Sequence, residues 1–397
     1  MKNFAVICEY NPFHFGHEYH ISELKKQGGN VVCVMSGDFC QRGEAAVPGK
    51  YERARAALSG GADLVLELPF PYSAAGAEKF AFGALDIISR LGFPLELSFG
   101  SECADAGAIL QTAKNTLSTE FEAAVSKRLE LNSEKPFASV YFETYRELFG
   151  ESGIFDGSNN ILGVAYSSQI IKRGLPVSIS TIKREGQNFC GTGEGFASAT
   201  YIREKLFEHG AEALEKLMPE YSYKILKAQA EEGKIASPEK LFPVFASFLR
   251  MHTAQDIACF AENDISLAAR LIKAGNDAEN MQELYSLAVT KKYSPSRVRR
   301  ALLFSYFGVT REMLCTPPAY TVLLAANARG RELLSNARKK ADIPIITKPA
   351  DYEKYGEKVK QAFEFSRKAA AVRLLAQEKA GSAADLMRKT PYIEKQT

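Results

Sequence analysis

The first hundred residues alternate between two hydrophobic periodicities, and this alternation constrains the fold more than any other feature. Short apolar runs rich in β-forming residues, each bounded by Gly, Pro or Asn, lie at 4–9, 31–35, 63–68 and 95–99. Stretches with helical spacing separate them, at 17–26, 50–59 and 75–90. Repeated strand–helix–strand units of this kind predict an α/β fold with a parallel sheet covered on both faces.

The pattern changes in the second half of the chain. A helix is predicted at 161–172 and a strand at 177–182, and Ser198 or Thr200 is suited to cap a helix that starts near Tyr201. From about residue 206 onward strand signals almost stop, and helical spacing dominates. We therefore expect two domains: an α/β domain over 1–205 and an α-helical domain over 206–397.

Composition and charge exclude several classes of protein. The 397 residues are 46% hydrophobic and 24% charged, which excludes collagen-like and disordered chains, and the sequence contains no apolar run of membrane-spanning length. Residues 1–200 carry 18 Lys and Arg against 23 Asp and Glu, whereas the remainder carries 32 against 24. The basic half is either a solvated helical surface or a surface for an anionic partner. The seven scattered cysteines form no C-x-x-C pair, which predicts neither disulfides nor a zinc site and fits a cytoplasmic protein.

The turn after the first predicted strand carries the strongest chemical signal. Three of the five histidines, His14, His17 and His20, fall within seven positions there, and Gly16 completes an H-x-G-H pattern. Glycine lets a ligand approach the backbone, and the helix N-terminus attracts phosphate. Two imidazoles there can donate hydrogen bonds to phosphate oxygens as negative charge develops. His20 is interpreted either as a supporting residue or as a structural one.

These motifs resemble a known family. The NPFHFGH turn is similar to the H-x-G-H signature of the nucleotidylyltransferase superfamily, and SATYIR at 198–203 is similar to its ISST-x-x-R element. Further segments, among them VMSGDFCQRGE, GADLVLELPFPYS, SFGSE, TIKREG, TKKYSPSRVRRALL and PAYTVLLAANARGRELL, resemble the tRNA(Met) cytidine acetate ligase family over nearly the whole chain. The resemblance implies a Rossmann-like sheet of the nucleotidylyltransferase type, followed by a helical domain that binds tRNA.

The resemblance also implies a reaction and its substrates. ATP would activate acetate as acetyl-adenylate and release pyrophosphate. Mg²⁺ is expected to accompany the nucleotide, without a binding site formed entirely by protein side chains. The acetyl group would then pass to the wobble cytidine of elongator tRNA(Met), giving N(4)-acetylcytidine. His14 and His17 are the expected catalytic residues. The expected ATP-binding residues are Ile7, Cys8, Glu9, Tyr10, Asn11, Pro12, Phe13, His14, Phe15, Gly16, His17, Glu18, Tyr19, His20, Gly100, Asn159, Asn160, Arg184, Ser198, Thr200 and Arg203.

Two further groups of residues are candidates. Asp38, Gln41, Arg42 and Glu67 follow the second and third predicted strands, where they either face acetate and cytidine or only close their loops. The helical half has one dense basic cluster, which comprises Lys291, Lys292, Arg297, Arg299 and Arg300. We expect this cluster to contact tRNA phosphates. The alternative interpretation is that it forms a solvated helix face. The sequence departs from the family at Asn188-Phe189-Cys190, where a Tyr-His-Asp-like element is expected.

Two other functions remain open at this level. The chain could be an adenylyltransferase that acts on a small phosphate substrate, although such enzymes rarely need nearly two hundred extra helical residues. It could also be a non-catalytic RNA-binding protein on the same scaffold, although the presence of both histidines and Arg203 argues against this.

Overall fold

The sheet that the sequence predicts forms the centre of the molecule. The computed structural model describes residues 2–132, 135–184 and 196–394. Over these residues one eight-stranded sheet has the order β10-β8-β5-β2-β1-β6-β7, with β9 paired to β8. Its strands are β1 (Asn3–Cys8), β2 (Asn30–Ser36), β5 (Leu64–Leu68), β6 (Glu96–Ser101), β7 (Ser178–Lys183), β8 (Thr321–Ala326), β9 (Ile345–Ile346) and β10 (Tyr392–Ile393). All pairings are parallel except that between β5 and β8.

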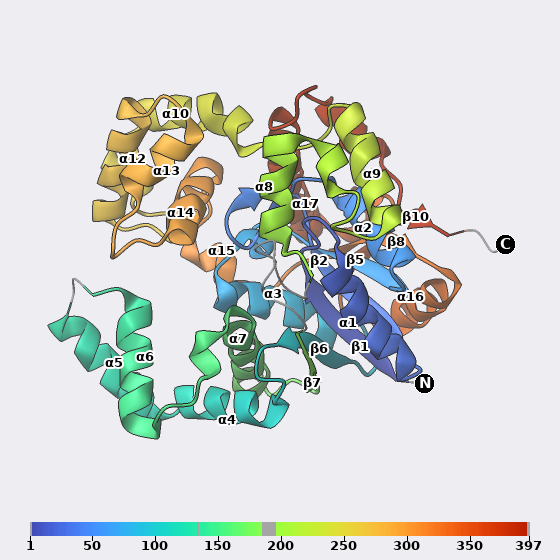
Figure 1. Cartoon of the computed structure of the whole chain (residues 1–397), viewed down its shortest axis with the longest axis horizontal. Helices are drawn as coiled ribbons and strands as arrows, with labels where there is room; N and C mark the ends of the chain where they lie inside the picture. Colours follow the sequence, from blue (N-terminus) through green and yellow to red (C-terminus); the bar gives the residue numbers. More distant parts are fainter. Residues whose placement is uncertain (1, 133–134, 185–195, 395–397) are drawn as a thin grey trace.

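Helices cover both faces of this sheet, as the βαβ pattern predicts (Figure 1). Apolar side chains of α3, α7 and α16 pack on one face, and those of α1, α2 and α17 pack on the other. The helices of this α/β part are α1 (Phe15–Lys26), α2 (Lys50–Ser59), α3 (Ala77–Ser89), α4 (Ala106–Thr116), α5 (Thr119–Leu131), α6 (Phe137–Phe149), α7 (Ser158–Arg173), α16 (Ala328–Lys340) and α17 (Glu357–Leu375). Near-continuous apolar strands are what such a doubly covered sheet requires.

A second group of helices lies beside the sheet and forms its own core (Figure 1). It is joined to the sheet by Phe70, which follows β5 and packs edge-on against Phe304 and Phe307. This group comprises α10 (Phe242–Arg250), α11 (Ala254–Ile257), α12 (Ile265–Asp277), α13 (Met281–Ala288), α14 (Pro295–Phe307) and α15 (Arg311–Cys315). A short hairpin of β3 (Phe39–Cys40) and β4 (Glu44–Ala45) lies between this group and the sheet. Two further helices, α8 (Ala199–His209) and α9 (Glu220–Glu231), pack together in a smaller core. None of the described helices is both long and apolar enough to cross a membrane.

The chain after residue 206 is largely helical, as predicted, but beyond Tyr320 it also adds strands to the sheet, which was not predicted. The run TVLLAA forms β8, which is buried throughout and pairs with β5. A short, almost wholly apolar run of this kind cannot be told from a buried helical segment by its periodicity. Asn327 then accepts the Gly330 N–H and caps α16. The C-terminal residues therefore complete the N-terminal sheet, and residues 206–397 do not form a separate helical body.

A buried guanidinium holds the carboxyl ends of β1 and β2 together. The Arg53 side chain on α2 is 1% exposed and donates to four carbonyl oxygens, those of Glu9 (2.6 Å), Ser36 (2.9 Å), Pro48 (3.2 Å) and Gly37. Three of these carbonyls, those of Glu9, Ser36 and Gly37, lie where β1 and β2 end, and the carbonyl of Pro48 lies just before α2. Arg53 thus supports the backbone from which the loops after both strands begin.

Replacing Arg53 should destabilise the whole protein. In Arg53→Leu four buried carbonyls lose their donor, and each unsatisfied group costs about 1–3 kcal/mol. We expect chemical denaturation to show a loss of roughly 3 kcal/mol or more in the free energy of unfolding. Arg55→Leu, an exposed position on the same helix, is the matched control and should change it by less than about 1 kcal/mol. Equal effects of the two substitutions would contradict this role.

Candidate active site

A cavity of about 970 Å³ opens at the carboxyl ends of β1, β6 and β7. The turn after β1, Gly100 of β6, Arg184 after β7, the N-termini of α7 and α8, and the start of α14 all line it. Ligands of open parallel sheets bind at such strand ends. The motifs that the sequence analysis singled out in separate segments therefore meet around one cavity.

The turn after β1 fixes both histidines through its backbone. Nδ1 of His14 accepts the Gly16 N–H at 3.1 Å, and Nδ1 of His17 accepts the His14 N–H at 3.3 Å. The two rings stack with 3.7 Å between their centroids. Because each Nδ1 is an acceptor, the hydrogen of each neutral ring must be on Nε2. Both imidazoles line the cavity, so they present N–H donors to it.

The surroundings keep these rings uncharged. Burial lowers the pKa of His14 to about 3, and Arg184 and Arg203 act in the same direction. Burial also lowers the pKa of His17 well below its ordinary value, with His14 and Arg184 contributing. The pKa of His20 falls to about 4, again chiefly through burial. His20 contacts Ser98 Oγ at 3.0 Å, so it is also held by the end of the sheet.

Not every residue between Ile7 and His20 reaches the cavity. Pro12, Phe13, Phe15 and Glu18 are absent from its lining. Phe13 is buried in the core, and Glu18 accepts the Tyr221 hydroxyl at 2.9 Å. The other ten residues of the turn line the cavity.

The Asn159-Asn160 pair at the start of α7 divides into a cavity residue and a structural one. The Asn160 side chain is buried and accepts from Ser101 Oγ (2.9 Å) and the Glu102 N–H (3.0 Å). Asn159 lines the cavity and accepts from Arg184 Nη1 at 3.0 Å. A Cβ at Gly100 would meet the Arg184 side chain at 3.1 Å, so glycine there leaves room for that arginine.

The start of α8 forms the opposite wall. Ser198 is the N-cap and accepts the Tyr201 N–H, as predicted, and Ser198 and Thr200 line the cavity. Arg203 donates to the Asn11 carbonyl at 2.9 Å and thereby ties α8 to the turn after β1. Asn188-Phe189-Cys190 lies outside the described residues.

Asp38 and Glu67, which we expected in the acetate and cytidine pocket, do not line the cavity. Both carboxylates bind the Lys50 ammonium, at 3.0 and 2.8 Å, and all three groups are largely buried. Burial opposes the charged form of Lys50, but the two acids outweigh it and hold the pKa of Lys50 well above its ordinary value. The alternative that these acids close their loops is the one the structure favours, whereas Gln41 and Arg42 do line the cavity.

The basic cluster on α14 is not a free basic surface. Arg297 pairs with Asp264 (3.2 Å), Arg299 with Glu44 (3.2 Å) and Arg300 with Glu262 (3.0 Å). Sequence spacing placed these arginines on one helix, but it could not show that their acidic partners lie on other segments. Lys291 is exposed, and the Lys292 ammonium lies over the Tyr293 ring.

Instead, α14 forms a wall of the cavity and supports the β3–β4 loop. Arg299 and Arg300 line the cavity, and Arg299 donates to the Arg42 carbonyl at 3.2 Å. Gly43, with φ of 76°, packs so closely that a Cβ there would lie 2.7 Å from the Arg300 backbone nitrogen. The sequence did not predict that α14 forms a wall of the cavity. It also did not predict that Glu44 lies between Arg299 and Arg203, because no local pattern indicates contacts between residues so far apart in the sequence.

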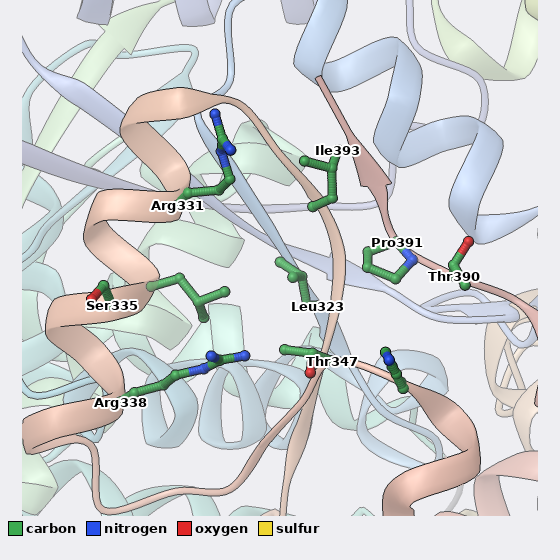
Figure 2. Close-up of a pocket in the computed structure, with 10 residues that line it drawn as sticks. Leu323, Arg331, Ser335, Arg338, Thr347, Thr390, Pro391 and Ile393 are labelled. Atoms are coloured by element: carbon green, nitrogen blue, oxygen red, sulfur yellow. The ribbon is translucent and has the colours of Figure 1, made fainter. Parts of the chain in front are cut away.

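A second, smaller cavity of about 460 Å³ lies at the other edge of the sheet. Figure 2 shows Arg331, Ser335 and Arg338 of α16 on one side and Pro391 and Ile393 on the other. None of the predicted site residues lines it, and the described residues of its wall include no His, Asp, Glu or Cys. We therefore assign the chemistry to the larger cavity.

The hydrogen bonds at the turn predict the protonation state of its histidines. At neutral pH the ¹⁵N shifts of His14 and His17 should be those of neutral rings protonated on Nε2, because burial lowers the pKa of both rings and both Nδ1 atoms accept backbone N–H groups. Long-range ¹H–¹⁵N spectra, assigned with His14→Gln and His17→Gln, measure this. An imidazolium at pH 7, or a ring protonated on Nδ1 alone, would contradict the geometry.

Comparison with known proteins shows the family of this chain. The family model described as HIGH Nucleotidyl Transferase matches residues 1–386. The tRNA(Met) cytidine acetate ligase of Thermosipho melanesiensis is 33% identical over 90% of this chain and 87% of its own. That of Acetivibrio thermocellus is 34% identical over 89% of this chain and 90% of its own.

Solved structures show the same relationship. The crystal structure of Thermotoga maritima TmcAL bound with alpha-thio ATP superposes with a TM-score of 0.90 at 29% identity, covering 99% of each chain. The apo form of the same protein superposes with a TM-score of 0.91. By the match of its whole length and by the histidine turn at its centre, the chain belongs to the HIGH nucleotidyl transferase family and, within it, to the tRNA(Met) cytidine acetate ligases.

Proposed function

We propose that this protein is an ATP-dependent ligase that activates acetate as acetyl-adenylate and transfers the acetyl group to the wobble cytidine of elongator tRNA(Met), giving N(4)-acetylcytidine. The observation that carries the proposal is the pair of neutral Nε2–H donors facing a cavity walled by arginines. The relatives named above and the ATP analogue bound by the Thermotoga maritima protein support it.

In the first step an acetate oxygen attacks the α-phosphorus of ATP, the bond to the β-phosphate breaks, and pyrophosphate leaves. His14 and His17 donate hydrogen bonds to the phosphate oxygens that gain charge, and their donors need no reorganisation because the backbone has already oriented them. Arg184 and Arg203 neutralise the leaving pyrophosphate. The exposed Arg42, beside Gln41 on the cavity wall, binds the acetate carboxylate.

Mg²⁺ is proposed to enter with the nucleotide rather than to reside in the protein. Among the described residues no three His, Cys, Asp or Glu side chains are grouped so that they could hold a metal ion. Magnesium commonly binds nucleotide phosphates with few protein ligands, and there it would withdraw charge from them.

The acceptor tRNA is proposed to lie across the helices that wall the cavity. Residues 1–205 carry the ATP and acetate chemistry, and residues from 206 onward, apart from the part that completes the sheet, bind tRNA. Lys291 and Lys292 just before α14 contact phosphates, while Arg299 and Arg300 shape the cavity that receives the cytidine. The protein is expected in the cytoplasm, where its tRNA substrate is.

Incubation with ATP, labelled acetate and tRNA(Met) tests the reaction directly. The wild-type protein should label the tRNA, and His17→Ala should lower acetate-dependent pyrophosphate exchange by about 10²–10³-fold, because one donor to the developing charge is lost. Binding of tRNA should change little. His252→Ala, on the helical group outside the cavity, is the control. Active wild-type protein that leaves the tRNA unlabelled would rule out the proposed function.

A pair of double variants separates tRNA contact from support of the cavity. Lys291→Ala with Lys292→Ala should reduce the slope of log affinity for tRNA against log salt by up to about 2, with pyrophosphate exchange unchanged. Arg299→Ala with Arg300→Ala should, unlike the lysine variant, lower pyrophosphate exchange, because the loop containing Gln41 and Arg42 loses its support. Exchange at the wild-type rate in the arginine variant would show that α14 does not support the catalytic cavity.

A further inference from the structure

The proposed transfer step needs a proton acceptor that the histidines do not provide. When the exocyclic amine of cytidine attacks the acetyl carbon, it must lose a proton before a neutral amide is formed. Nδ1 of His14 and of His17 already accepts a backbone N–H, and each Nε2 carries a hydrogen. His20 contacts Ser98 Oγ, and its pKa of about 4 makes it a weak base. The histidines of this cavity are therefore suited to donate hydrogen bonds and not to accept the amine proton.

Two carboxylates line the cavity among its described residues, and only one is free of an ion pair. Glu44 is held by Arg299 at 3.2 Å and lies 3.8 Å from Arg203. Within the described part of the chain Glu9, the residue that follows β1, makes no salt bridge. Its Oε1 accepts the Gln41 N–H at 2.7 Å, and no described residue forms a hydrogen bond with its Oε2.

The position of Glu9 places it between the two substrates of the proposed reaction. It precedes the histidine turn that is proposed to bind the phosphates, and it is bound to the loop whose Arg42 is proposed to bind acetate. The backbone carbonyl of Glu9 is one of the four that Arg53 holds, so the main chain at this position is fixed as well. A cavity-lining carboxylate with one oxygen anchored and the other without a partner among the described residues is suited to take a proton from a bound substrate.

We propose that Glu9 is the general base of acetyl transfer. The N4 lone pair of the cytidine attacks the acetyl carbonyl carbon, the bond from that carbon to the adenylate oxygen breaks, and AMP leaves as an anion. The proton lost by N4 passes to Glu9 Oε2 and then to solvent, so charge and atoms balance. This inference rests on the proposed function and adds a role that the ATP-binding turn does not by itself require.

The surroundings of Glu9 are compatible with this role. Burial raises the pKa of its carboxyl, which strengthens it as a base, while the Gln41 N–H and the cations Arg203 and Arg42 keep the rise limited. The charged or titratable groups that influence it come from three elements: Arg203 of α8, Arg42, Cys40 and Glu44 of the β3–β4 hairpin, and Tyr166 of α7. Proton transfer to Glu9 requires its ionised form, so the transfer rate should fall as the pH drops through its raised pKa.

The substitution Glu9→Gln tests the proposal, because the glutamine oxygen can still accept the Gln41 N–H but the side chain cannot take a proton. Adenylation of acetate releases no proton that needs a base, so acetate-dependent pyrophosphate exchange should fall much less than acetyl transfer, although Glu9 lines the nucleotide cavity. Single-turnover transfer from synthetic acetyl-adenylate to tRNA(Met) should fall about 10²–10³-fold and lose its dependence on the Glu9 pKa. Glu44→Gln is the matched control and should retain that pH dependence.

The outcomes separate this inference from the proposed function. If the wild-type protein does not acetylate tRNA(Met) at all, the proposed function fails, and the role of Glu9 fails with it. If the wild type is active and Glu9→Gln transfers acetyl at the wild-type rate, Glu9 is not the base. Equal losses in exchange and in transfer would also overturn the proposal, because they would show that Glu9 only positions the turn.

Discussion

The active cavity depends on one buried interaction, the Arg53 guanidinium bound by four carbonyl oxygens, three of which lie at the ends of β1 and β2. A buried charge is costly unless it is fully hydrogen-bonded, and here its partners are backbone carbonyls. One of them is the carbonyl of Glu9, from which the histidine turn continues. Nearby, Lys50 joins Asp38 after β2 to Glu67 of β5. These contacts fix the segments from which the histidine turn and the β3–β4 hairpin begin.

The backbone of the turn determines which hydrogen-bonding groups the histidines present to the cavity. The N–H groups of His14 and Gly16 occupy the two Nδ1 atoms, so the imidazoles face the cavity as neutral donors. Burial and the neighbouring arginines keep them uncharged at neutral pH. Donors for phosphate oxygens and an acceptor for the amine proton are thus assigned to different residues, His14 and His17 for the former and Glu9 for the latter. The donors are needed when the phosphate gains charge, and the acceptor only when the amide forms.

The sequence predicted what local patterns encode. The strands β1, β2, β5, β6 and β7, the helices between them and the Ser198 cap follow from periodicity and turn chemistry. The expectation that Arg184 and Arg203 lie with the H-x-G-H turn came from the resemblance to the family, and all of them line one cavity. Asp38 and Glu67 were misplaced, because a polar residue at a strand end can face a ligand or a buried Lys50. Arg299 and Arg300 were expected to contact tRNA phosphates, and their ion pairs were not predicted, because Glu44 and Glu262 approach them only in three dimensions. The strand β8 was missed, because its six buried residues, five of them apolar, show no periodicity that distinguishes a strand from a helix.

The central claim is that this cavity makes acetylcytidine in tRNA. Mass spectrometry of the nucleosides of elongator tRNA(Met), from cells with and without this protein, measures the product in its natural substrate. The account predicts that N(4)-acetylcytidine disappears at the wobble position when the protein is absent and returns when the wild-type chain is restored. An unchanged level of acetylcytidine in cells that lack the protein would contradict the account.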